Sequence, residues 1–261
     1  MTGPAEVVTR VARACWDDHR YCGHTLTELV GHETFLGLTF MAATGRRATG
    51  EERALLDALT VATAAADPRI WPLRITRLVA AYGSTTAGFV AGQLCVENEA
   101  IGPWVTGPAG ELLTSARDTV GALDDAAFDA AATAWLGTRR RLAGYGVAFR
   151  EQDERLGNVA AYLERSGRAG LPFWRTLQRL SVVVLRERGL RPNISMGVAA
   201  ALLDTGITPP QAQVLINLSA ANTFYANAIE GARQRSEVLR VLPVDSVRYV
   251  GRGPRPLPAD R

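Results

Sequence analysis

Lysine is absent from this sequence, and histidine is scarce. All 29 residues counted as lysine or arginine are arginine, and the only histidines are His19, His24 and His32, near the N-terminus. Histidine is the commonest general base in enzymes, and no Ser/His/Asp set can be assembled here. The arginine excess can indicate phosphate binding or only the base composition of the gene. The single basic run, residues 137–144, follows an expected helix whose end favours cations, so nucleic-acid binding is not expected.

Cysteine and long apolar runs are lacking too. Cys15, Cys22 and Cys95 are an odd number without the spacing of a disulfide framework. The N-terminus has no continuous apolar core of the kind found in signal peptides. No segment approaches the ~20 consecutive apolar residues that a membrane helix needs. These absences predict a soluble, cytoplasmic protein without membrane contact.

The densest group of metal-ligand residue types lies in "CWDDHRYCGH", residues 15–24. Zinc sites pair their ligands at spacings such as CxxC or HxxxH, whereas Cys15, His19, Cys22 and His24 stand singly. We therefore interpret this segment as a surface turn or β-like hairpin and expect no bound metal.

The sequence is rich in alanine, leucine and arginine, which cost little in a helix. Residues 49–66 begin with Thr49 and Glu52 at the spacing of a capping box. Further helices are expected as a short pair within 25–45, as a short apolar helix ending at Asp204, and over 73–83, 84–100, 124–142, 151–167, 171–189 and 208–236. With no convincing strand, the predicted class is all-α.

Glycine and proline are concentrated in "IGPWVTGPAG", residues 101–110, which predicts a loop and a boundary between two lobes. A chain of 261 residues is long for one core and sufficient for two. The proline-rich tail, residues 240–261, is expected to be extended.

Three segments, in this order, resemble the active-site segments of citrate synthases and citryl-CoA lyases. They are "IGPWVTGPAGE" (101–111), "AGYGVAFREQDER" (143–155) and "LRPNISMGVAAALLDTGI" (190–207). The segments 19–52 and "VDSVRYVGRGPRP" near the C-terminus are similar to other parts of the same family, so that the resemblance covers roughly residues 19 to 255.

The resemblance implies an all-α fold with a large helical domain, residues 1–106 and 207–261, and an inserted small domain, residues 107–206, on the coenzyme A side. It also implies a dimer, either a homodimer or a heterodimer with a related subunit. The family's chemistry uses a carboxylate to remove a proton from the thioester. Two histidines polarise the thioester and the acceptor carbonyl.

The family's catalytic residues are replaced at the matching positions of this sequence. One histidine falls on Val105, the other falls on Val147 or is deleted in the shorter loop, and the carboxylate falls on Ser195. Two substrate-binding arginines fall on Ala220 and Leu242. These replacements argue against citrate synthesis by the family mechanism, and they make the cleft more apolar, which favours a bulkier or neutral ligand.

Other positions keep polar groups that suit a binding site. The resemblance implies that Arg150, Arg155 and Asn193 contact substrate or coenzyme A, since a guanidinium suits carboxylate and phosphate. The candidate catalytic groups are Ser195, Asp67 and Tyr145. A purely structural alternative for Ser195 is to cap the helix that follows it.

Two functions are therefore compatible with the sequence. One is a divergent enzyme that forms or cleaves a carbon–carbon bond in an acyl-CoA or related carboxylic substrate, with coenzyme A thioester as substrate and no tightly bound cofactor. The other is a catalytically inactive subunit or ligand-binding regulator that pairs with an active relative. An unrelated helical scaffold is disfavoured by the ordered motifs.

Overall fold

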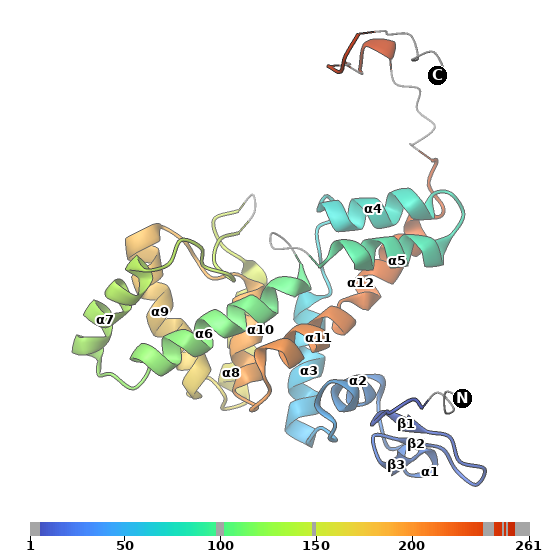
Figure 1. Cartoon of the computed structure of the whole chain (residues 1–261). Coiled ribbons are helices and arrows are strands. Elements are labelled where there is room, and N and C mark those ends of the chain that lie inside the picture. The colour runs from blue at the N-terminus through green and yellow to red at the C-terminus, as the bar shows by residue number, and fades with distance from the viewer. Residues whose placement is uncertain are drawn as a thin grey trace, which may run out of the picture.

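The computed structural model describes residues 6–97, 102–147, 150–236, 243–246, 248 and 250–253, and helices dominate it (Figure 1). A three-stranded antiparallel sheet lies near the N-terminus, made of β1 (Ala12–Arg13), β2 (Arg20–Tyr21) and β3 (His24–Thr25). The hairpin interpretation of residues 15–24 is confirmed by the pairing of β2 with β3. The expectation of no strands is wrong for this short sheet, whose two-residue strands carry no readable alternation.

Three helices follow the sheet: α1 (Leu26–Leu29), α2 (Phe35–Thr44) and α3 (Gly50–Thr63). The predicted capping box of α3 is present, because the Thr49 hydroxyl accepts from the Glu52 N–H and the Glu52 carboxylate accepts from the Thr49 N–H. Gly45 ends α2 in the left-handed conformation that glycine adopts without strain. Local capping signals thus set the bounds of these helices.

A second group consists of α4 (Trp71–Ala80), α5 (Thr85–Cys95) and α12 (Ala221–Gly231), which pack on one another (Figure 1). Gly88 and Gly92 let α5 approach α4 closely. A Cβ on Gly92 would lie 1.9 Å from Thr76 Oγ1 and 2.7 Å from Phe224 Cδ1. These small residues are needed for the close packing of the three helices.

The main core is built from α3, α6 (Thr106–Val120), α7 (Asp125–Gly137), α8 (Glu154–Arg165), α9 (Pro172–Arg188), α10 (Ile194–Leu203) and α11 (Pro209–Ser219). The central helix is α10, which contacts α6, α8, α9 and α11. Every residue of α10 except Ser195 is buried. This explains why its sequence is apolar on all sides.

Two sequence predictions are wrong in this region. Residues 101–110 are not one loop: a 3-10 turn, η1 (Pro103–Val105), leads directly into α6, which begins at Thr106. Pro108 lies in the first turn of α6, where its missing N–H costs no hydrogen bond. The expected helix 208–236 is divided into α11 and α12 at Ala220.

The predicted division into a large and a small domain stays a prediction. The main core cluster contains residues from both parts, among them Leu55 and Leu215 from one and Leu113 and Leu180 from the other. The predicted tail lies mostly outside the described residues. In the part of it that the structure describes, a short 3-10 turn covers Val244–Ser246. None of the described helices is long and apolar enough to cross a lipid bilayer.

Candidate functional site

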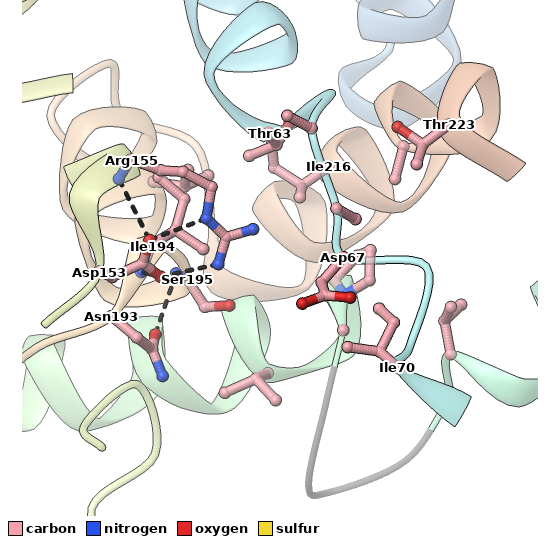
Figure 2. Close-up of a pocket in the computed structure, with 18 of the residues that line it drawn as sticks. Thr63, Asp67, Ile70, Asp153, Arg155, Asn193, Ile194, Ser195, Ile216 and Thr223 are labelled. Carbon is pink, nitrogen blue, oxygen red and sulfur yellow. Dashed lines mark hydrogen bonds and ion pairs between the residues drawn. The ribbon is translucent and has the colours of Figure 1, made fainter. Parts of the chain in front are cut away.

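A cavity of about 250 Å³ lies where five parts of the chain meet (Figure 2). Its lining comes from the α3–α4 linker, the turn before α6, the segment leading into α8, the start of α10 and the α11–α12 junction. Helices α4, α6, α8 and α10 all begin at this cavity, so the positive ends of four helix dipoles surround it. Such an arrangement favours a ligand that carries negative charge.

The cavity brings together nearly all the residues that the sequence singled out. Its lining includes Asp67, Val105, Val147, Arg150, Arg155, Asn193, Ser195 and Ala220. Leu242 lies outside the described residues. The segments that carry the family resemblance therefore meet at one place, although they are far apart in the chain.

Tyr145 is the exception, and its position does not suit the catalytic role predicted for it. It does not line the cavity, and its side chain is buried in the main core with its hydroxyl 3.4 Å from Ser181 Oγ. Burial raises the pKa of the Tyr145 phenol well above its ordinary value. A buried, neutral phenol at this position fills the core.

Asp153 connects two helix N-termini at the cavity. As the N-cap of α8 it accepts from the Arg155 N–H at 3.2 Å, and it also accepts from the Ile194 N–H, at the start of α10, at 3.0 Å. The Arg155 guanidinium binds both carboxylate oxygens through Nε at 2.8 Å and Nη2 at 2.7 Å. Burial raises the pKa of Asp153, but the hydrogen bonds from Arg155 and Ile194 outweigh it and leave the pKa below its ordinary value.

Asn193, not Ser195, caps α10. The Asn193 side-chain oxygen accepts from the N–H groups of Ser195 at 3.0 Å and Met196 at 3.4 Å, while its amide donates to the Gly146 carbonyl at 3.0 Å. The structural alternative for Ser195 is therefore wrong. The Ser195 hydroxyl is half-buried, faces the cavity, and has no hydrogen-bond partner among the described residues (Figure 2).

Asp67 faces Ser195 from the opposite wall, on the α3–α4 linker (Figure 2). Arg69 donates to both Asp67 oxygens, from Nε at 3.0 Å to each and from Nη2 at 2.6 Å to Oδ2. This guanidinium lowers the pKa of Asp67 to about 2. Arg150 lies 3.8 Å from Asp67 and forms a close ion pair with Glu154, the first residue of α8.

Most of the remaining lining is apolar. It includes Ile70, Pro72, Val96, Val105, Val147, Val198, Ile216, Ala220 and Phe224. Thr106 also lines the cavity, and its buried hydroxyl has no hydrogen-bond partner among the described residues. None of the three histidines, all of which the structure describes, lines the cavity.

Metal ligands do not gather in the described part of the chain: no group of three or more His, Cys, Asp or Glu side chains could hold an ion there. His19 Nδ1 accepts a hydrogen bond from the Cys15 N–H at 3.2 Å, and the three cysteines, all of which the structure describes, form no disulfide. Residues 15–24 therefore form a local turn, and their side chains, all within the described part of the chain, are not grouped as metal ligands.

Three charged residues of the cavity are not among the predicted site residues: Arg69, Asp153 and Glu154. A signal for Asp153 was present, since an Asp immediately before a helix is a typical N-cap. The signal for Arg69 is weaker. It lies two residues after Asp67, close enough to pair with that carboxylate, but the segment was interpreted only as the end of a helix. Nothing in the sequence indicates that the Asp153 carboxylate also reaches α10.

No family model and no curated protein matches the sequence, whereas solved structures do match the fold. Citryl-CoA lyase from Hydrogenobacter thermophilus has a TM-score of 0.78 and 19% identity, with 97% of each chain covered. ATP citrate lyase from Methanothrix soehngenii, solved with citrate and coenzyme A, has a TM-score of 0.75 and 13% identity over 97% of this chain and 43% of that one.

A third match is citrate synthase from Thermoplasma acidophilum, solved with carboxymethyl coenzyme A and oxaloacetate. Its TM-score is 0.63 at 16% identity, over 87% of this chain and 59% of that one. Identities this low establish the fold and leave the activity open. This chain has the fold of the citrate synthase and citryl-CoA lyase superfamily.

Proposed function

We propose that this protein is a divergent enzyme that acts on an acyl-CoA or related carboxylic substrate and forms or cleaves a carbon–carbon bond. The observation that carries this proposal is the cavity itself. It gathers the segments that resemble the family's active site, keeps an ionised carboxylate and a free hydroxyl facing each other, and is surrounded by helix N-termini. Val105, Val147 and Ser195 stand where the family has its catalytic residues, so the protein is not a standard citrate synthase.

Asp67 and Ser195 are the candidate catalytic groups. In the condensation direction, an Asp67 oxygen accepts a proton from the carbon next to the thioester, and the resulting carbanion attacks the carbonyl carbon of the second substrate. The electron pair of the carbonyl π bond passes to its oxygen, which takes up a proton from water to give the alcohol. The Ser195 hydroxyl donates a hydrogen bond to the enolate oxygen. Arg69 lowers the pKa of Asp67 to about 2, so this carboxylate is ionised at neutral pH, as a general base must be.

Arg150, Arg155 and Asn193 are the candidate binding groups. Arg150 is exposed at the rim and suits a phosphate of coenzyme A, whereas Arg155 is half-buried and suits a carboxylate or thioester oxygen. Asn193 holds the loop at Gly146 against the start of α10 and so positions Ser195.

A dimer is part of the proposal, and an exposed apolar face supports it. Helices α5, α11 and α12 expose large apolar side chains at four-residue spacing: Val90, Leu94, Val214, Leu218, Tyr225 and Ile229. A groove between α5 and α11 also contains Gln93 Nε2 and Asn217 Oδ1, buried without hydrogen-bond partners among the described residues. Exposed apolar surface of this kind marks a protein interface.

The second candidate function is a non-catalytic subunit or ligand-binding regulator. It is favoured by one observation: no histidine lines the cavity, so the electrophilic groups of the family chemistry have no equivalent there. In this case the exposed apolar side chains of α5, α11 and α12, which together form the α5–α11–α12 face, would bind a related, active chain.

The test is thermal unfolding of the pure protein with coenzyme A and a series of acyl-CoA thioesters, followed by deuterium exchange at the thioester α-carbon in D₂O. A ligand at ~1,000 times its Kd adds about 4 kcal/mol of stability. A stabilising thioester whose α-protons exchange supports the enzyme, and Asp67→Asn should abolish the exchange while binding remains. Stabilisation without exchange supports the regulator. No stabilisation by any thioester refutes the enzyme and leaves the non-catalytic subunit, which needs only a protein partner.

A further inference from the structure

The charges that line the cavity indicate which second substrate it accepts. We infer that the compound sharing the cavity with the thioester carries a single carboxylate and an apolar substituent, and that di- and tricarboxylates are rejected. This inference rests on the proposed function and concerns the same site.

Every arginine of the described lining already has a carboxylate partner. Arg155 binds Asp153, Arg69 binds Asp67, and Arg150 forms a close pair with Glu154. Three arginines and three carboxylates therefore cancel in formal charge. A tricarboxylate that entered the cavity would find no uncompensated cation among these residues.

The three carboxylates are ionised at neutral pH. Arg69 lowers the pKa of Asp67 to about 2, and Arg150 holds the pKa of Glu154 below its ordinary value. A second carboxylate on a ligand therefore meets arginines that are already paired, and it would lose its hydration without gaining a free cation. The ionised Asp67 and Glu154 would also repel it.

One carboxylate nevertheless has a suitable place, beside Arg155. The Nε and Nη2 atoms of Arg155 bind Asp153, and the remaining guanidinium nitrogen is turned toward the open cavity (Figure 2). The N-termini of α8 and α10 lie on the same side and contribute positive dipole ends. A single carboxylate can thus be bound without breaking the Asp153 contacts.

The rest of the compound meets apolar walls. Val105 and Val147 stand where the resemblance places histidines, and Ala220 stands where it places an arginine. Val198 and Ile216 complete this side. Burial of an alkyl substituent here removes apolar surface from water and so strengthens binding, whereas a second carboxylate would lose its hydration without a partner.

The experiment is calorimetric titration of the full-length protein saturated with the stabilising thioester. Three probes are compared: 3-methyl-2-oxobutanoate with one carboxylate, oxaloacetate with two and citrate with three. The monocarboxylate should bind at least ~10-fold more tightly than either of the others, as one unfavourable charge contact costs about this factor in a partly desolvated site.

A matched pair of variants isolates the charge effect. Glu154→Gln frees Arg150 at the cavity, whereas Glu151→Gln makes the same change in total charge at an exposed residue outside the lining. Glu154→Gln should narrow the preference for the monocarboxylate over citrate by about three-fold, the effect of one unit charge at ~6 Å in water. Glu151→Gln should leave the preference unchanged.

Citrate binding as tight as that of the monocarboxylate would overturn the inference, and so would equal effects of the two variants. Binding of the thioester without binding of any probe would also overturn it while leaving the proposed function intact. Failure of every thioester to bind would instead refute the proposed function, and this inference with it.

Discussion

Asp153 is the residue whose replacement should affect this protein most sharply. The residue is 6% exposed, and its carboxylate accepts four hydrogen bonds, two from the Arg155 guanidinium and two from N–H groups at the starts of α8 and α10. Asp153→Asn keeps the shape of the side chain but removes the charge and turns an NH₂ group toward two of these donors. The variant therefore tests the hydrogen bonds that join α8 to α10 through Asp153, without leaving a cavity.

The expected loss follows from the groups left unpaired. A hydrogen bond to a charged group contributes ~1.5–3 kcal/mol, and a buried N–H without a partner, here that of Ile194, costs ~1–3 kcal/mol. Because these terms overlap, we expect the free energy of unfolding to fall by about 3 kcal/mol. For a chain of this size, that corresponds to a Tm lower by about 6–12 °C.

The assay is urea unfolding followed by circular dichroism, with Asp129→Asn as the control. Asp129 forms a 2.7 Å ion pair with Arg186 at the surface, with half of its side chain exposed, so solvent screens the pair and its loss should cost much less than the loss of the Asp153 contacts. If Asp153→Asn destabilises the protein no more than Asp129→Asn does, the connecting role of Asp153 is refuted.

The pH dependence provides a second check on Asp153. Its pKa in the folded protein lies below the ordinary value of ~3.9, so its contribution to stability is complete above about pH 4. That contribution is lost as the pH falls through the folded-state pKa. The difference in stability between the wild type and Asp153→Asn should therefore shrink below pH 4, and a constant difference would contradict the assignment.

Three further predictions concern packing, catalysis and assembly. Gly92→Ala should destabilise the protein by ~1–3 kcal/mol, because its Cβ would lie 1.9 Å from Thr76 Oγ1. Gly157→Ala, which meets no atom within 4 Å, should instead stabilise it by ~0.5–1 kcal/mol, and equal Tm shifts for the two would rule out the packing argument. Ser195→Ala should lower the rate of α-proton exchange while the urea midpoint stays unchanged; full exchange would remove Ser195 from the mechanism. Leu94→Glu should convert a dimer to a monomer in light scattering, since Leu94 is 75% exposed on the α5–α11–α12 face, and an unchanged mass would place the interface elsewhere.

The sequence predicted the helical class and most helix positions because those depend on local signals. Thr49 with Glu52 marks the start of α3, Gly45 marks the end of α2, and both are confirmed. The start of α6 was missed, since glycine and proline at 102–110 also occur in loops, and only packing against α10 and α11 makes them helical. The division of residues 208–236 at Ala220 has no local signal either, because no glycine or proline stands there.

The candidate site was predicted as a set of positions but not as a set of contacts. Resemblance indicated that Asp67, Val105, Arg155 and Ser195 would meet, and the cavity brings them together. Which charged side chains pair with one another depends on the directions in which they leave different helices. The spacing of residues in the sequence does not give those directions. For the same reason Tyr145, placed next to the site by its position in the chain, instead packs into the core.

The cavity is assembled from five stretches as distant as Thr63 and Phe224, and this has a consequence for its dynamics. Fraying of any one of α4, α6, α8 or α10 would remove a wall, so no partly unfolded form retains the site. A bound ligand therefore opposes local opening in all of these helices at once. Amide hydrogens at the starts of α6, α8 and α10 should then slow their exchange with solvent together, by one common factor, when the ligand is added.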